Sequence, residues 1–131
     1  MEELFNCGFN DKDIELMIEI NDEILDLSNN EIKEKTDILK SINCDEEQIK
    51  NILVSNPLYL NRCNEDILNL IKRLYDLKIN SLNLLFDSNP WMLNKDAFEI
   101  DDFIYKKQQE GIVLEYIIDM LDSNPYIINE E

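Results

Sequence analysis

The sequence predicts an all-α fold, a helical-repeat solenoid of three to four units of about 33–35 residues each. The first supporting observation is an internal repeat, because segment 49–61 recurs at 82–94 and at 117–129 with its proline in the same place. The second is the i, i+3, i+4 spacing of apolar residues within each copy, which is typical of one helix face. The third is that no alternating run is long enough for a β-strand. Each unit should contain a helix, a proline corner, a short helix and a longer helix.

The first unit is a degenerate copy that lacks the proline. Asp22 stands where the other copies have proline. The residues that match the copy 35 positions downstream are Ile14, Met17, Ile18, Asn21, Ile24 and Leu25. Ser28 and Glu31 form a capping-box pattern, which predicts a helix that runs from there through Ile42.

The second unit follows the same plan with clearer local signals. Asp45 and Gln48 form a capping-box pattern at the start of its first helix. That helix should end at Asn56, because the residue before a proline is disfavoured in the α region. Pro57 suits the first position of the short helix, where its missing N–H costs nothing. A longer helix capped by Asn64 should follow. Its apolar stripe is expected at Ile67, Leu68, Ile71, Leu74 and Tyr75.

The third and fourth units continue the pattern to the end of the sequence. Asp96 with Glu99 predicts a capped helix through about Glu110, and Gly111 suits its C-terminal stop. We expect one helical-repeat domain over residues 1–131, with units at approximately 4–38, 39–74, 75–110 and 111–131.

The leucine-and-proline skeleton of these copies resembles the repeat of the mitochondrial transcription termination factor (mTERF) family. It is Ile52-Leu53-x-x-x-Pro57-x-x-Leu60 in the second unit, Leu85-Phe86-x-x-x-Pro90-x-x-Leu93 in the third and Met120-Leu121-x-x-x-Pro125-x-x-Ile128 in the fourth. The resemblance covers nearly the whole chain and implies a curved superhelix of three-helix units, with the three prolines as structural corners. It also implies a basic concave face that grips nucleic acid, and the chain lacks the basic residues for such a face.

The charge of the chain is strongly negative and unevenly distributed. The 131 residues contain 29 acidic and 12 basic side chains and no histidine, for a net charge of -17. Residues 1–38 carry a net charge of -9, residues 39–95 are balanced, and residues 96–131 carry -8. Such asymmetry is informative about binding partners rather than about fold.

Acidic residues at helical spacing predict a partner-binding surface at both ends of the repeat array. Glu15, Glu19, Asp22 and Asp26 could form one ladder along the first unit, provided that its corner stays nearly helical. The full set of predicted partner-binding residues is Glu15, Glu19, Asp22, Asp26, Glu99, Asp102, Glu115, Asp119, Asp122 and Trp91. The alternatives are a solvated face that only confers solubility and, for the acids, a divalent-metal site. Trp91 follows a repeat proline, and the alternative for it is packing at the corner against the adjacent helix rather than anchoring a partner.

The balanced middle holds seven basic residues, at positions 40, 50, 62, 72, 73, 78 and 95. They are interspersed with acids, which favours ordinary surface ion pairs. A small nucleic-acid patch is the alternative, and it would consist of Arg62, Lys72 and Arg73.

Several functional classes are disfavoured by composition. Without histidine, the chain has no imidazole base and no histidine metal ligand. It also has no glycine-rich phosphate loop and no nucleophile elbow, so we expect no enzyme, no cofactor and no metal site. Cys7, Cys44 and Cys63 are odd in number and lack CxxC spacing, which indicates reduced and mostly buried thiols. The start of the chain has no signal-peptide character, and no apolar run could span a bilayer, so we expect a cytoplasmic protein with no membrane partner.

These observations predict a non-enzymatic interaction protein that docks on a basic protein surface. The partner is expected to be a nucleic-acid-handling protein, and the chain would act as its competitor or inhibitor, a nucleic-acid mimic of the anti-CRISPR or anti-restriction type. The alternative that the family resemblance implies is an mTERF-like nucleic-acid-binding transcription regulator. A third reading is a scaffold or oligomerisation module that uses exposed solenoid ends, unless the proline-less first unit acts as a cap.

Overall fold

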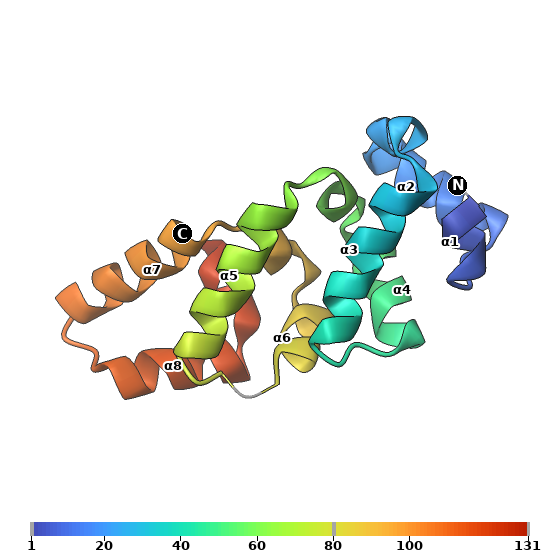
Figure 1. The fold of residues 1–131 in the computed structure, drawn as a ribbon. Helices are drawn as coiled ribbons and strands as arrows, with labels where there is room; N and C mark the ends of the chain where they lie inside the picture. The colour runs from blue at the N-terminus through green and yellow to red at the C-terminus, as the bar shows by residue number, and fades with distance from the viewer. Residues whose placement is uncertain (1, 80, 131) are drawn as a thin grey trace.

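The structure, a computed structural model, describes residues 2–79 and 81–130. Within these two ranges the regular elements are helices, with no strand, which confirms the all-α helical-repeat prediction (Figure 1). The α-helices are α1 (Glu2–Asn6), α2 (Asp11–Ile20), α3 (Asn29–Ser41), α4 (Glu46–Ser55), α5 (Asn64–Asp76), α6 (Leu82–Ser88), α7 (Ala97–Gln109) and α8 (Leu114–Ser123). Short 3₁₀ helices form the corners η1 (Asp22–Asp26), η2 (Pro57–Asn61), η3 (Pro90–Asn94) and η4 (Pro125–Glu130).

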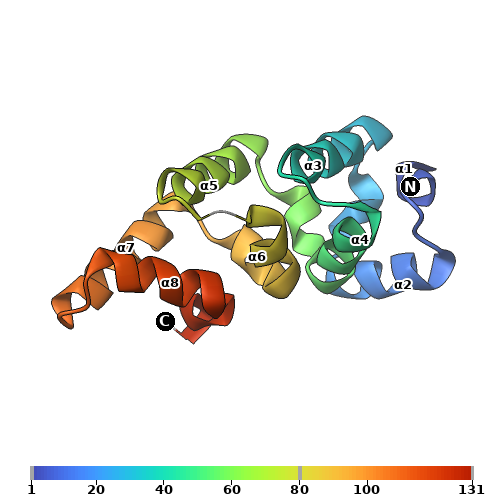
Figure 2. The same ribbon diagram turned by 90° about the horizontal axis from the view of Figure 1, so that it is seen from below.

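The elements fall into repeated groups that stack side by side. We call α2-η1-α3 unit 1, α4-η2-α5 unit 2, α6-η3-α7 unit 3 and α8-η4 unit 4. The first helices of units 1 to 3 contact one another in order, and each corner contacts the corner of the next unit. Figure 2 shows the units following one another from the N-terminal to the C-terminal side, with α3 and α5 in a separate row from α4 and α6. The fold is therefore a solenoid whose units meet mainly their neighbours.

The predicted helix caps are largely confirmed. Ser28 with Glu31, Asp45 with Gln48, and Asp96 with Glu99 each form a reciprocal capping box. The expectation that Asn64 caps α5 is wrong. Cys63 occupies the N-cap position and makes no side-chain cap bond, whereas Asn64 begins the helix and donates its amide N–H to Glu34 Oε2 at 2.8 Å. The side chain of Asn64 therefore bonds to Glu34, 30 residues away, instead of capping its own helix.

The longer helices of units 1 to 3 end in the same way, and so does α1. Each is followed by a residue with positive φ, after which a backbone N–H returns to a carbonyl five positions back. These residues are Gly8, Asn43, Lys78 and Gly111, with φ of 94°, 71°, 68° and 89°. The returning bonds run from Phe9 to Leu4, Cys44 to Leu39, Ile79 to Leu74 and Ile112 to Lys107, at 3.1–3.4 Å. This is the Schellman type of helix end, and its recurrence shows that α1 ends as a third helix of a unit does.

The buried stripe of α5 is narrower than the sequence predicts. Ile67, Leu70 and Leu74 are buried in the shared core. Leu68 and Tyr75, which were expected in the stripe, are 49% and 69% exposed. The i, i+3, i+7 positions face the neighbouring helices, and positions one residue later turn about 100° away from them.

A row of buried asparagines joins each unit to the next. Asn56, which precedes Pro57, donates its side-chain N–H to the carbonyl of Pro90 at 2.9 Å and to Asn94 Oδ1 at 3.1 Å. Asn94 returns a bond to Asn56 Oδ1 at 3.0 Å. Asn21 makes the same two donations to Pro57 and Asn61, and Asn89 makes them to Pro125 and Asn129. Three successive junctions are therefore held by one repeated polar contact at the corners.

The corner of unit 1 breaks the helix although it has no proline. Asn21 adopts φ −144° and ψ 89°, and its side-chain oxygen accepts a bond from the backbone N–H of Glu23 at 3.2 Å. The inter-unit bonds of the same amide hold this geometry in place. Leu25, which matches the buried Leu60 in the repeat, is 60% exposed in this unit.

Candidate interaction surfaces

Seven of the predicted partner-binding acids form two exposed acidic faces. We define the N-terminal acidic face as Glu15 and Glu19 of α2 with Asp22 and Asp26 of η1, and the C-terminal acidic face as Glu115, Asp119 and Asp122 of α8. All seven side chains are exposed. None of them forms an ion pair with a described residue. The charge at the two ends of the array is therefore open to solvent.

The expected continuous ladder in unit 1 does not form. Its condition was a nearly helical corner, and the extended backbone of Asn21 separates α2 from η1. Glu15 and Glu19 remain one helical turn apart on α2, while Asp22 and Asp26 belong to a second short helix. On α8, by contrast, no break intervenes, so Glu115, Asp119 and Asp122 follow i, i+4 and i+3 spacing on one helix.

Two other predicted acids are occupied within the chain. Glu99 accepts the backbone N–H of Asp96 at 2.8 Å as part of the capping box of α7. Asp102 pairs with Lys106 one turn along the same helix, at 3.1 Å. These carboxylates have local structural roles that the seven acids of the two faces lack.

The candidate nucleic-acid patch is neutralised by acidic partners. Arg62 pairs with Asp96, Arg73 pairs with Asp101, and Lys72 pairs with Asp76 at 3.1 Å. These contacts leave all three predicted phosphate-binding side chains engaged with carboxylates.

Arg62 is the most buried of these basic side chains and serves the junction between units 2 and 3. Its side chain is 14% exposed. Besides pairing with Asp96, it donates to the carbonyl of Leu93 at 2.5 Å and to that of Lys95 at 3.0 Å. It therefore fixes the end of η3 and the start of α7 rather than facing solvent.

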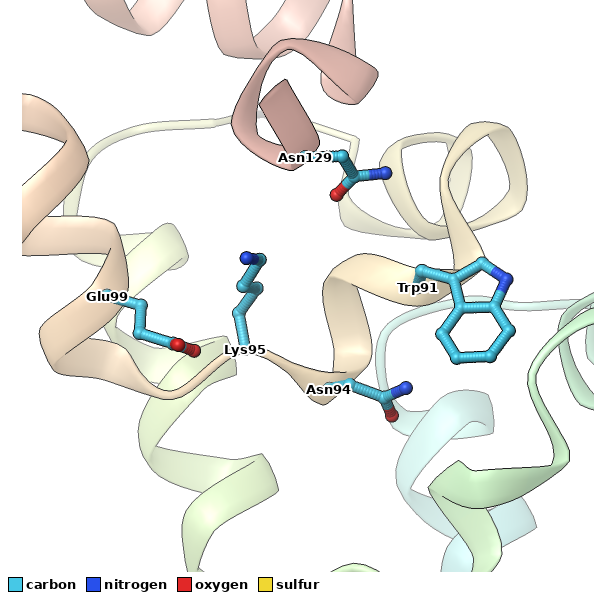
Figure 3. Close-up of a pocket in the computed structure, with 5 residues that line it drawn as sticks. All are labelled: Trp91, Asn94, Lys95, Glu99 and Asn129. Atoms are coloured by element: carbon cyan, nitrogen blue, oxygen red, sulfur yellow. The ribbon is translucent and has the colours of Figure 1, made fainter. Parts of the chain in front are cut away.

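An open cavity of about 310 Å³ lies where η3, α7 and η4 meet. Figure 3 shows Lys95 extending into the space between Trp91, Asn94, Glu99 and Asn129, which line it. Trp91 is 40% exposed there, so it is not an ordinary buried corner residue.

Tyr59 of η2 is fully buried and donates its hydroxyl to the carbonyl of Lys35 at 2.8 Å. Burial raises the pKa of Tyr59 and keeps its hydroxyl protonated.

The described residues contain no group of three or more carboxylate or thiol ligands that could hold a metal ion.

The three cysteines are free thiols, but the expectation that they are mostly buried holds only for Cys44, since Cys7 is half-buried and Cys63 is exposed. Burial raises the pKa of Cys44 to about 12, which keeps this thiol neutral. Over the described part of the chain, every helix is too short or too polar to cross a bilayer.

Comparison with protein families agrees with this architecture. The family model of mTERF matches residues 1–85, which include units 1 and 2 and the start of unit 3. The chain belongs to the mTERF family. Membership places it among nucleic-acid-related helical-repeat proteins, and it agrees with the leucine-and-proline skeleton seen in the sequence. Comparisons with curated proteins and with solved structures gave no match.

Sequence reasoning missed the junction residues. The asparagine before each corner was interpreted only as a helix end, although it recurs as Asn21, Asn56, Asn89 and Asn124. Lys95 was grouped with surface bases, although it stands 33 residues after Arg62 in the repeat. In both cases the repeat register itself was the available signal, because equivalent positions in stacked units face equivalent neighbours.

Proposed function

We propose that this mTERF-family chain is a non-enzymatic module that binds a basic surface of a partner protein through its two acidic faces. The observation that supports this most directly is the unequal pairing of its charges. The acids of both faces are exposed and form no ion pair with described residues, whereas Arg62, Lys72 and Arg73 are each paired with an acid. A net charge of -17 attracts cationic proteins over long range and repels polyanions.

The expected partner is a protein that itself handles nucleic acid. Neighbouring carboxylates at i, i+4 on a helix lie about 6 Å apart, close to the spacing of phosphates along a strand. A basic groove that binds a phosphate backbone would find similar charges on α8. The chain would then compete with nucleic acid for that groove, as an inhibitor of a restriction or CRISPR type of nuclease would.

The test is partner capture with matched charge variants. Wild type and the variant E15Q/E19Q/D119N/D122N are immobilised and exposed to host lysate, and bound proteins are eluted in steps of salt. We expect basic proteins that bind wild type, are released by salt and by added DNA or RNA, and are lost from the variant. The matched control is E34Q/E46Q/E47Q/E65Q, which removes the same charge from exposed sites outside the two faces. Equal capture by both variants would contradict the role of the acidic faces.

Family membership favours a second candidate, direct nucleic-acid binding. It is tested by titrating fluorescent DNA and RNA of about 20 nucleotides with the protein at low salt, where phosphate contacts are strongest. Submicromolar binding that weakens steeply with salt would reverse the ranking of the two functions. Because the three candidate phosphate contacts are neutralised within the chain, we expect no binding under these conditions.

A further inference from the structure

The junction between units 2 and 3 shows how the last helix of one unit, α5, packs against the last helix of the next, α7. On α5, Arg62 lies just before the helix and Arg73 near its end, and they pair with Asp96 and Asp101 of α7. Asp96 is the N-cap of α7, and Asp101 follows five residues later. Arg62, just before α5, and Arg73, within α5, thus hold two carboxylates at the start of the helix packed against α5.

The outer face of α7 repeats this receiving surface 33 residues later in the sequence. Lys95 corresponds to Arg62, Phe103 to Leu70, and Lys106 to Arg73. A second cavity, of about 210 Å³, lies on this face. It is lined by Lys95, Glu99, Asp102, Phe103, Lys106 and Ile128. It adjoins the cavity at Trp91, since Lys95 and Glu99 line both. We call the surface formed by Trp91, Lys95, Glu99, Phe103 and Lys106 the α7 seat.

We propose that the α7 seat binds an amphipathic helix of a partner protein, one that carries a carboxylate at its N-cap and a second carboxylate five residues later. The internal precedent supplies the charge complementarity, because α5 holds α7 through the same two positions with the same signs of charge. Lys95 forms no ion pair with a described residue and points into the cavity (Figure 3). No described helix covers this face of α7 as α7 covers α5.

The acids of the seat do not prevent this binding. Glu99 is engaged with the backbone N–H of Asp96. Asp102 pairs with Lys106, but this pair lies between two side chains more than half exposed, so it is weak, and Lys106 can share its ammonium with a second carboxylate. On α5 the position of Glu99 is also acidic, since Asp66 stands there, and α7 nevertheless packs against that helix. Helix-in-groove recognition of this kind reads side chains at helical spacing, so an extended acidic segment would fit less well. The inference is independent of the acidic faces, which lie on other elements.

The sequence of α7 itself is a suitable probe, because it carries the two carboxylates at the required spacing. A synthetic peptide of residues 95–110 contains Asp96 and Asp101 and no tryptophan. Trp91, the single tryptophan of the chain, lines the seat, so its fluorescence reports binding to the intact protein. The peptide and the protein both carry net negative charge, so long-range electrostatics opposes rather than drives their non-specific association.

We expect a saturable change in Trp91 fluorescence as this peptide is added to the full chain. Binding should weaken at least about tenfold for Lys95→Glu, and by a similar factor when the peptide carries D96N and D101N, since each change removes a carboxylate–ammonium contact. Lys12→Glu is the matched control. It changes the net charge equally at an exposed site on α2, and it should leave binding within about twofold.

Two results would overturn the proposal. The first is the absence of any saturable fluorescence change at millimolar peptide, or binding that Lys95→Glu leaves unchanged. The second is sedimentation of the wild-type chain as a dimer that Lys95→Glu dissociates, because this would place a second copy of the chain on the seat. Circular dichroism of each variant verifies that the helices are intact before binding is measured.

Discussion

The interior junctions and the terminal units of this solenoid use the same sequence motif for different purposes. Asn56 and Asn124 both stand in a Ser-Asn-Pro corner. Asn56 is fully buried and makes reciprocal bonds with Asn94, whereas Asn124 is exposed at the corner of unit 4 and makes no side-chain hydrogen bond to a described residue. A corner asparagine therefore acquires its structural role from the unit that follows it.

The same contrast applies to charge. In the interior, Arg62 is mostly buried and binds three acceptors on unit 3. Its counterpart Lys95 points into an open cavity, and the acids of α8 are exposed. Interior side chains are satisfied by neighbouring units, whereas Lys95 and the α8 acids form no ion pair with a described residue. This division is expected when stability is a sum of units and their nearest-neighbour contacts.

The strongest test of this comparison removes the asparagine amide from an interior corner, at Asn56, and from the corner of unit 4, at Asn124. Asn56→Ala leaves the Pro90 carbonyl and the Asn94 side chain without their partner, and we expect a loss of about 2–4 kcal/mol in the free energy of unfolding. Asn124→Ala removes an exposed side chain, and we expect a change of less than about 0.5 kcal/mol. Chemical denaturation followed by circular dichroism measures both. Similar losses for the two variants would show that the corner asparagine acts locally rather than between units.

A second contrast pairs Arg62 with Lys95. Arg62→Met removes the bonds to two carbonyls and to Asp96, and we expect a destabilisation of about 2 kcal/mol. Lys95→Met removes a side chain that forms no ion pair with a described residue, so a change of less than about 0.5 kcal/mol is expected. The same denaturation experiment applies. If Lys95→Met proved as costly as Arg62→Met, the last unit would be held as tightly as the interior.

The tyrosine hydroxyls give a third, smaller contrast. The buried hydroxyl of Tyr59 joins η2 to the carbonyl of Lys35 in the middle of α3. Tyr59→Phe should cost about 1–2 kcal/mol, because the buried carbonyl loses its donor. Tyr126 of η4 is 53% exposed, and Tyr126→Phe should be neutral in the same chemical denaturation measurements. A neutral Tyr59→Phe would indicate that water replaces the lost donor.

The elements that depend on a few neighbouring residues were predictable from sequence. The capping boxes at Ser28, Asp45 and Asp96 and the corner at Pro57 follow from local sterics and hydrogen bonding, and all are present. Asn64 was predicted wrongly because its amide found Glu34, 30 residues away. Which contacts cross a junction depends on the angle between stacked units, and the composition of one unit does not reveal that angle.

The candidate site was predictable to the same limited extent. The seven acids of the two faces are exposed as expected, because a carboxylate is costly to bury without a partner. The ladder in unit 1 failed at Asn21, whose backbone leaves the helical conformation after α2 and whose side-chain amide bonds to unit 2. The α7 seat escaped prediction because it becomes visible only when α5 is seen to bind α7 through equivalent positions.

The smallest expected effect concerns two capping boxes. They differ in the residue three positions after the N-cap, which is the titratable Glu31 in α3 and the neutral Gln48 in α4. In α3 the carboxylate of Glu31 accepts the backbone N–H of Ser28, which lowers the pKa of Glu31. In α4 the amide of Gln48 fills the same role and does not titrate. A carboxylate whose pKa is lower in the folded state contributes stability above its unfolded pKa, and it loses that contribution as the pH falls through the folded pKa.

The variant Glu31→Gln converts the first box into the second type. We therefore expect the difference in unfolding temperature between wild type and Glu31→Gln to shift in favour of the variant as the pH falls from 7 to below the Glu31 pKa. The other carboxylates titrate in both proteins, so their contribution cancels in the difference. A difference that stays constant over this range would mean that the Glu31 carboxylate and an amide cap α3 equally well in either protonation state.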